Sequence, residues 1–145
     1  MVHQLIYLSK TKEPLRSNDV KEINNISERE NKKIDVTGCL IYYQKRFLQI
    51  LEGEKTNVES LYRKIKADER HSEVTTLGRF ETDSRIFPHW SMAFLKEKEV
   101  AKLSSTENIL QQNLQNFSYI KEDENPASLL FWIKARGIVE NQTHK

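Results

Sequence analysis

The sequence predicts an α+β fold, in which a β-sheet carries two helices on one face and further helices follow near the C-terminus. Two segments, 17–32 and 56–68, have apolar residues at helical spacing, and strand-like segments lie on either side of each. The segment from Val36 to Gly53 has the pattern of a β-hairpin, because two largely apolar runs flank a polar pair. Beyond residue 102 the apolar residues return to helical spacing.

The first strand is expected at residues 3–9, and the first helix follows it. Ser17 or Asn18 is predicted as the N-cap of that helix, because a short polar side chain can accept a hydrogen bond from a free backbone N–H group. The helix should end near Lys32. Its inward stripe is predicted from three apolar residues at helical spacing: Val20, Ile23 and Ile26.

The hairpin is predicted from two strands, 36–43 and 46–52, which are joined by a turn around Gln44 and Lys45. Gly53 should end the second of these strands, because glycine weakens a strand interior.

A second helix is predicted after the hairpin and should end near Asp68. Thr56 and Glu59 have the spacing of a capping box at its start. One side of this helix is apolar and should face the sheet: Val58, Leu61, Tyr62 and Ile65.

Two more strands, 74–82 and 89–96, are predicted on either side of a break at Pro88. The resulting order is βαββαββ. Its first six elements match the ferredoxin-like arrangement, which places both helices on the same face of the sheet.

The rest of the chain is expected to be helical. One helix is predicted at 103–117, and another should start at Asn125-Pro126, where a cap precedes a proline at the first helical position, and end near Gly137. The sequence therefore predicts a first domain at 1–97 and a C-terminal helical extension at 98–145.

Composition limits the classes of protein that fit. The chain has 145 residues and a formal net charge of +2 with both signs interspersed, so it does not have the charge of a polybasic nucleic-acid binder. The only cysteine, Cys39, excludes an intrachain disulfide and a site of several cysteines. No apolar run approaches the length of a membrane span, and no metal-ligand spacing occurs. A cytoplasmic protein with no membrane partner and no direct nucleic-acid partner is expected.

One polar residue interrupts the hairpin, since Gln49 lies between Leu48 and Ile50. An unpaired buried amide would cost about 1–3 kcal/mol, so Gln49 should bond a specific partner. Tyr7 is the expected partner, because the first and third strands are central neighbours in a ferredoxin-like sheet. Trp90 and Met92 share a face of the fifth strand. Together these residues predict a polar pocket with apolar walls, which is typical of a small-molecule site.

Each of these residues also has a purely structural interpretation. Tyr7 and Gln49 could simply satisfy each other's hydrogen bonds. Trp90 and Met92 could be core residues. Asn31 could be a helix C-cap. Three further polar residues could be solvated surface: Lys64, Arg70 and His71.

The sequence resembles the BLUF family, the flavin-based blue-light sensors. The resemblance covers roughly residues 3–96 and depends on the following segments in the family's order: Leu5-Ile6-Tyr7-Leu8-Ser9, Asn31, Thr37-Gly38, Phe47-Leu48-Gln49-Ile50-Leu51-Glu52-Gly53, Asp68-Glu69-Arg70-His71 and Phe87-Pro88-His89-Trp90-Ser91-Met92. The resemblance implies non-covalent binding of FAD, with its ring between the two helices.

The resemblance also implies roles for individual residues. Tyr7 would be the photochemical donor of an electron and a proton, Gln49 the hydrogen-bond switch, and Asn31 the contact at the polar edge of the ring. Trp90 and Met92 would lie on the strand that relays the signal. Apolar walls are implied at Ile23, Phe47 and Ile65, and contacts to the ribityl and phosphate part at Lys64, Asp68, Arg70 and His71. The chain departs from the family with lysine in place of arginine at Lys64 and an acidic residue at Glu30.

These expectations define a blue-light photoreceptor rather than an enzyme. Light would drive proton-coupled electron transfer from Tyr7 and leave the hydrogen bonds of Gln49 rearranged. The signal would pass to a separate downstream protein or through homo-oligomerisation. Phe131 and Trp132 could serve such an interface, although packing against the open face of the sheet is the expected role. Two alternatives stay open: a light-independent ferredoxin-like ligand-binding regulatory module, and a small acyl-phosphate hydrolase, although the anion loop that the hydrolase needs is not found.

Overall fold

The computed structural model of the chain describes residues 1–13, 15–88, 93–95 and 126–143. Its centre is a five-stranded sheet in the order β4-β1-β3-β2-β5. The β5 strand pairs parallel with β2, and the other neighbours are antiparallel. The strands are β1 (Val2–Thr11), β2 (Thr37–Tyr43), β3 (Arg46–Gly53), β4 (His71–Thr82) and β5 (Ala93–Leu95).

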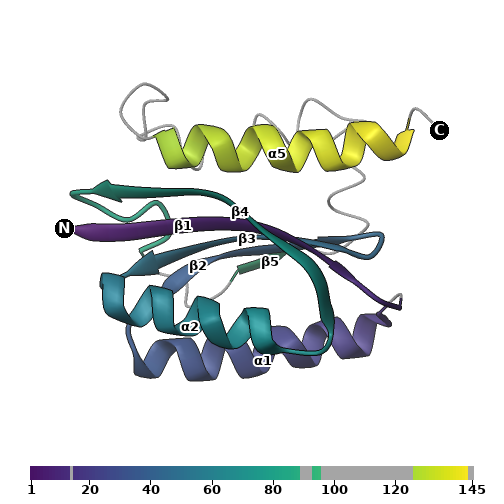
Figure 1. Cartoon of the computed structure of the whole chain (residues 1–145), viewed down its shortest axis with the longest axis horizontal. Coiled ribbons are helices and arrows are strands. Elements are labelled where there is room, and N and C mark those ends of the chain that lie inside the picture. The colour runs from purple at the N-terminus through teal and green to yellow at the C-terminus, as the bar shows by residue number, and fades with distance from the viewer. Residues whose placement is uncertain (14, 89–92, 96–125, 144–145) are drawn as a thin grey trace.

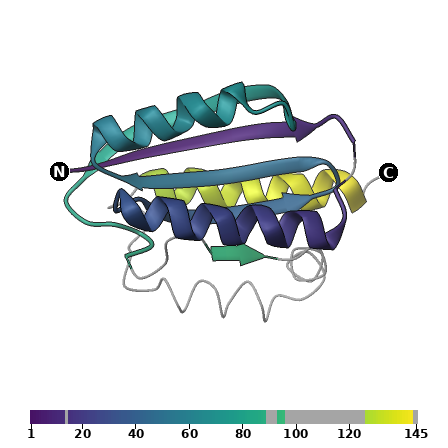
Figure 2. The same cartoon turned by 90° about the horizontal axis from the view of Figure 1, so that it is seen from below.

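Helices cover both faces of this sheet. Figure 1 shows α1 (Ser17–Lys33) and α2 (Lys55–Ala67) together on one face and α5 (Pro126–Thr143) on the opposite face. Figure 2 shows α1 and α2 side by side, with strands of the sheet behind the space between them. The predicted α+β ferredoxin-like fold, with two helices on one face, is confirmed. In the described ranges no helix is long and apolar enough to span a bilayer.

Strand alternation divides the sheet into two cores. One face of β1 and β3 packs Leu5 and Phe47 against α1 and α2, where Val20 and Val58 are buried. The other face packs residues such as Ile50 against α5. Neighbouring residues in a strand point to opposite faces, so each strand serves both cores.

The α5 helix covers the second core mainly through small and aromatic side chains. Ala127, Phe131 and Ala135 are buried, and Trp132 is half-buried beside them. This confirms the predicted packing of Phe131 and Trp132 against the open face of the sheet. The helix continues through Gly137, so the predicted end at that residue is wrong. A glycine inside a helix costs only about 1 kcal/mol relative to alanine, and packing on the sheet can outweigh that cost.

A buried carboxylate links the hairpin to this second core. Glu52 is fully buried and accepts hydrogen bonds from the backbone N–H groups of Ile86 and Phe87, both at 2.8 Å. It also accepts one from Gln4 Nε2 at 2.7 Å. The Phe87 ring in turn contacts Phe131 of α5 edge to face, with a centroid distance of 6.1 Å. Glu52 thereby fixes the segment after β4 between the end of β3 and α5.

The hairpin turn has the predicted position. Gln44 and Lys45 have φ values of +45° and +69°, in the left-handed region. Two such residues are typical of the tight turns that join antiparallel strands, because their twist matches that of the strands.

Both predicted helix caps are wrong. The N-cap of α1 is Arg16, with Ser17 as the first helical residue, and the N-cap of α2 is Glu54 rather than Thr56. In α1 the Asp19 carboxylate accepts a hydrogen bond from the Arg16 backbone N–H at 3.2 Å. A carboxylate in the first turn satisfies a free donor in place of a capping side chain.

Glu59 has a different partner from the one its capping-box spacing predicts. Its carboxylate accepts two hydrogen bonds from the Arg79 guanidinium, at 2.9 and 3.0 Å, and lies 2.7 Å from His3 Nε2. The Arg79 guanidinium, with a smaller contribution from His3, lowers the pKa of Glu59 to about 2. This ion pair ties α2 to β1 and β4.

Ile26 does not belong to the inward stripe of α1, since 41% of it is exposed. Each step of three residues falls about 60° short of a full helical turn. Two such steps from Val20 therefore rotate Ile26 by about 120° towards solvent. The inward stripe continues instead through polar residues at positions 27 and 31.

Three expectations concern residues outside the described ranges. These are most of the predicted strand 89–96, of which only β5 is described, the helix at 103–117, and the cap at Asn125. Pro126 is the first residue of α5, as its position after the predicted cap implies.

Substituting Gly38 should strongly destabilise the sheet. A Cβ atom at this position of β2 would lie 1.9 Å from the carbonyl oxygen of Ile50, so the backbones of β2 and β3 would have to separate. We expect Gly38→Ala to lower the free energy of unfolding by about 3 kcal/mol, as measured by urea denaturation.

Gly78→Ala is the matched control for this variant. Its Cβ would meet the ring of Phe80 at 2.8 Å, and that ring can rotate away. A loss of about 1 kcal/mol is expected. Equal losses in the two variants would contradict the close approach at Gly38.

Candidate functional site

Tyr7 and Gln49 form a buried pair on the helix-facing side of the sheet. They are Cα partners in the β1–β3 register, and their side chains are only 2% and 4% exposed. The Tyr7 hydroxyl donates a hydrogen bond to Gln49 Oε1. The predicted contact between the first and third strands is therefore confirmed.

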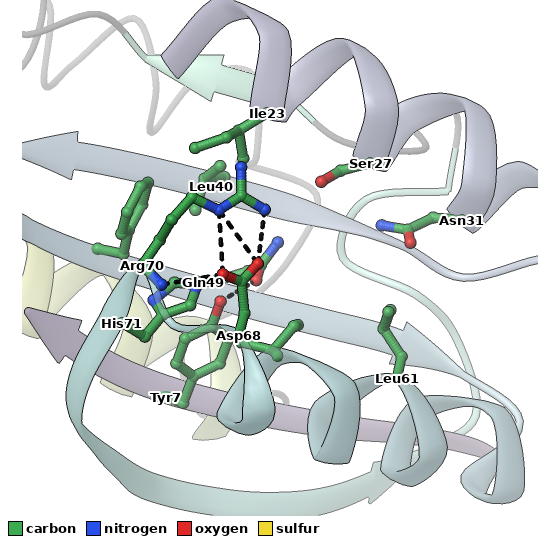
Figure 3. A pocket seen from close by; sticks show the side chains of 12 residues that line it. Tyr7, Ile23, Ser27, Asn31, Leu40, Gln49, Leu61, Asp68, Arg70 and His71 are labelled. Atoms are coloured by element: carbon green, nitrogen blue, oxygen red, sulfur yellow. Dashed lines mark hydrogen bonds and ion pairs between the residues drawn. The ribbon is translucent and has the colours of Figure 1, made fainter. Parts of the chain in front are cut away.

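A cavity lies above this pair, between the sheet, α1 and α2 (Figure 3). The empty space within and above it is about 470 Å³, which includes space open to solvent. The residues that line it come from the sheet, from both helices and from the connection into β4: Tyr7, Leu40, Phe47, Gln49 and His71 from strands, Ile23, Ser27 and Asn31 from α1, Leu61 and Ile65 from α2, and Asp68 and Arg70 from the connection.

One end of the cavity carries an amide. Asn31 is 2% exposed, and Figure 3 shows its side chain directed into the cavity. Within the described residues no hydrogen bond of this side chain occurs. The C-cap of α1 is Ile34, so the alternative interpretation of Asn31 as a C-cap is wrong. A buried carboxamide that faces a cavity is suited to bind a ligand with both donor and acceptor atoms.

The other end of the cavity carries charge. Arg70 donates hydrogen bonds to the Asp68 carboxylate, including Nε to Oδ1 at 3.0 Å (Figure 3). The Arg70 guanidinium lowers the pKa of Asp68 to about 2. Arg70 therefore stays a cation at the mouth of the cavity, where it can bind an anionic group.

His71 lies beside this ion pair but is held by other contacts. Its Nδ1 lies 2.8 Å from Ser9 Oγ, and its ring lies 5.3 Å from the Phe47 ring. Burial lowers the pKa of His71 below its usual value, which favours the neutral imidazole at neutral pH.

The surroundings of Tyr7 keep its phenol protonated. Its ring lies 5.3 Å from the ring of Tyr62, whose hydroxyl is 2.6 Å from Thr76 Oγ1. Burial, with smaller contributions from Tyr62 and Asp68, raises the pKa of Tyr7 well above its ordinary value. Tyr7 therefore enters any reaction as a neutral hydrogen-bond donor.

The cavity brings together most of the site residues expected from sequence. Those that line it are Tyr7, Ile23, Asn31, Phe47, Gln49, Ile65, Asp68, Arg70 and His71. Lys64 is exposed on α2 and does not line the cavity, because it lies about 100° around the helix from Ile65. Trp90 and Met92 lie outside the described residues.

Three lining residues were missed by the sequence analysis, although the pattern contained a signal for each. Ser27 lies four residues from both Ile23 and Asn31, so it shares their face of α1. Leu61 has the same relation to Ile65 on α2. Leu40 is the Cα partner of Gln49 across the hairpin, so both side chains point to the same side.

A cavity between two helices, with a hydrogen-bonded tyrosine and glutamine on its floor, is typical of an α+β domain that binds a small molecule. The model of the BLUF family, described as sensors of blue-light using FAD, matches residues 2–93. This chain belongs to the BLUF family.

Relatives include large light-regulated enzymes. The chain is 32% identical over 114 residues to the photoactivated adenylate cyclase subunit alpha of Euglena gracilis, and 30% identical over 118 residues to subunit beta of Euglena longa. These alignments cover 78% and 81% of this chain but only 11% and 14% of the relatives. The chain thus spans a small part of the length of these curated relatives.

Solved structures with a similar fold include the BLUF protein BlrB. The dark-state structure of BlrB has a TM-score of 0.70 and 26% identity, over 97% of this chain and 96% of that one. The photo-activated state of BlsA has a TM-score of 0.63 and 30% identity, over 81% and 91%. A bacterial light-regulated adenylyl cyclase has a TM-score of 0.68 and 32% identity, over 83% and 36%.

The residues of the cavity fit a flavin. Apolar side chains of Ile23, Leu40 and Ile65 can contact the faces of a flat ring, and the amides of Asn31 and Gln49 can bond its polar edge. The cation of Arg70 at the other end can bind a phosphate.

Replacing Tyr7 should change how stability depends on alkaline pH. The folded state holds the Tyr7 proton more tightly than the unfolded state, in which the pKa is near its ordinary value of 10.0, so stability falls as pH rises above that value. Between about pH 9 and pH 11 the free energy of unfolding should fall more steeply in the wild type than in Tyr7→Phe, by up to about 1.4 kcal/mol per pH unit. Urea denaturation across this range measures the difference, and identical slopes would contradict the buried neutral phenol.

Proposed function

We propose that this chain binds FAD non-covalently in the cavity between α1 and α2 and converts blue-light absorption into a change in the hydrogen bonds of Gln49. The observation that carries this proposal is the buried hydrogen bond from Tyr7 to Gln49 on the cavity floor. It joins an oxidisable donor to an amide that can both accept and donate, next to the space where the ring fits.

When bound, a flavin that has absorbed blue light supplies a strong electron acceptor beside the cavity floor. Tyr7 is the donor, because its phenol lies at the cavity and becomes strongly acidic once an electron is removed. The hydrogen bond that already exists gives the phenolic proton a path to Gln49 Oε1. Electron and proton leave Tyr7 together along two different routes.

The return of both particles to Tyr7 leaves Gln49 rotated or tautomerised. In that state Gln49 would donate a stronger hydrogen bond to a carbonyl of a bound ring, which would shift the absorption to longer wavelength. One changed hydrogen bond is worth about 1 kcal/mol. This free energy is enough to bias an element with two conformations of similar stability, and it is too small to drive a large rearrangement alone.

FAD is the proposed flavin, on the basis of the family description and the charged end of the cavity. A related solved structure, BlrP1 of Klebsiella pneumoniae, is described with FMN. Release of the cofactor by denaturation, followed by chromatography against FAD and FMN standards, decides between them. Recovery of FMN alone from purified protein would contradict the FAD proposal.

We also propose that the chain acts as a sensor without a catalytic step of its own, residues 1–97 being the sensor domain and 98–145 an extension that passes the signal on. The extension would act through self-association or on a separate protein. Leu129 and Ile133 support this role for α5, because they lie one turn apart and are 42% and 55% exposed.

The test of this function is the visible spectrum of the purified protein before and after blue light. The wild type should be yellow and show a reversible shift to longer wavelength. Tyr7→Phe and Gln49→Leu should retain the flavin and lose the shift, because each removes one member of the hydrogen-bonded pair.

Tyr43→Phe is the matched control. Tyr43 is also buried, but it packs in the core on the opposite face of the sheet, so its loss should leave the shift intact. Normal cycling in Tyr7→Phe would contradict the proposed roles. Flavin binding without any shift in the wild type would favour the light-independent module.

A further inference from the structure

Ser9 does not line the cavity but contacts one of the residues that do. It follows Tyr7 by two positions on β1, so both side chains point to the same face of the sheet. Ser9 is fully buried, and its Oγ lies 2.8 Å from Nδ1 of His71, the first residue of β4. His71 lines the charged end of the cavity (Figure 3).

The direction of this hydrogen bond follows from the burial of Ser9. A serine hydroxyl has one proton to donate, and a buried donor without an acceptor costs about 1–3 kcal/mol. In the described part of the chain His71 Nδ1 is the one hydrogen-bond partner of Ser9 Oγ. The hydroxyl must therefore donate to Nδ1, and Nδ1 must be the unprotonated nitrogen of the ring.

The other nitrogen of His71 then carries the proton. A neutral imidazole has one donor and one acceptor, so an acceptor at Nδ1 requires a donor at Nε2. Nε2 has no hydrogen bond to any described residue, while the ring itself is held by Phe47 at 5.3 Å and by Tyr7 at 6.4 Å between centroids. The ring is thus fixed in orientation, and its Nε2–H donor is left for a ligand.

We propose that Ser9 is a positioning residue that fixes His71 as the Nε2–H tautomer, so that His71 contributes a neutral hydrogen-bond donor to an acceptor oxygen of the bound flavin. This inference rests on the proposed function, since the ligand is the flavin of the same cavity. The acceptor is an oxygen of the ribityl chain or of a phosphate, because both accept from a neutral N–H group. Arg70 and Asp68 beside His71 supply the charged contacts at this end.

The tautomer can be measured without any flavin. We expect ¹⁵N NMR of the His71 ring in flavin-free protein near neutral pH to show the Nε2–H form. Ser9→Ala should convert it to a mixture of tautomers, and Ser9→Thr, which keeps the hydroxyl, should restore the single form. Ser72→Ala is the control, because Ser72 adjoins His71 in sequence but donates to the Lys10 carbonyl oxygen instead.

Binding measurements test the consequence for the ligand. Ser9→Ala should weaken FAD binding about twofold, because only the Nε2–H fraction of an even tautomer mixture can bind. His71→Gln, which keeps a neutral donor near the Nε2 position, should bind FAD more tightly than His71→Phe. The position of the acceptor follows from comparing ligands in His71→Phe. If this variant weakens the binding of riboflavin as much as that of FAD, the acceptor lies on the ribityl chain. If it weakens the binding of FMN and FAD only, the acceptor lies on a phosphate.

Two results would overturn this inference. One is the finding that His71 of the wild type has the Nδ1–H form. This measurement needs no variant, so it tests the inference even if Ser9→Ala does not fold. The other is an unchanged tautomer in a folded Ser9→Ala. A protein that has the Nε2–H tautomer but no light response would overturn the photochemical function alone, so the two failures are distinguishable.

Discussion

The structure depends on the register between β1 and β3, which places Tyr7 opposite Gln49. A slip of one residue would move the side chains of one strand to the other face of the sheet and separate the pair. Two features resist such a slip. A slip would expose apolar side chains on both faces at once, those of Leu5 and Phe47 on one face and that of Ile50 on the other. The close approach of Gly38 to the Ile50 carbonyl holds β3 against β2 on its other edge, so a shift of β3 would also disturb that contact. Packing of the whole sheet thus fixes a single hydrogen bond.

The sequence predicted the fold and the floor of the cavity because both depend on alternation. Gln49 was conspicuous in an apolar strand, and the two-residue period placed it beside Tyr7 without knowledge of any tertiary contact. The N-caps of α1 and α2 were not predicted, because Arg16 and Glu54 have no capping preference and a carboxylate in the first turn of α1 satisfies a free donor there. Ser27 was missed because its face of α1 was judged by apolar residues alone, and a ligand cavity also needs polar ones.

The cavity separates three kinds of polar contact along its length. Amides of Asn31 and Gln49 can both donate and accept, the imidazole of His71 is neutral, and Arg70 carries a charge that Asp68 partly balances. This order suits a ligand that has a heteroaromatic ring at one end and an anion at the other. The same arrangement keeps the cation at the mouth of the cavity, away from Tyr7 on its floor, so that the phenol stays in a largely apolar surrounding.

The cover that α5 provides for the second core limits how this sensor can be shortened or fused. Ile6, Leu48 and Ile50 point away from the flavin cavity and are buried beneath Phe131 and its neighbours. A chain cut after β5 would present these side chains to water and would tend to aggregate, however well its cavity were formed. An engineer who transplants this BLUF domain onto another protein must therefore keep α5 or supply another apolar element to cover the second core.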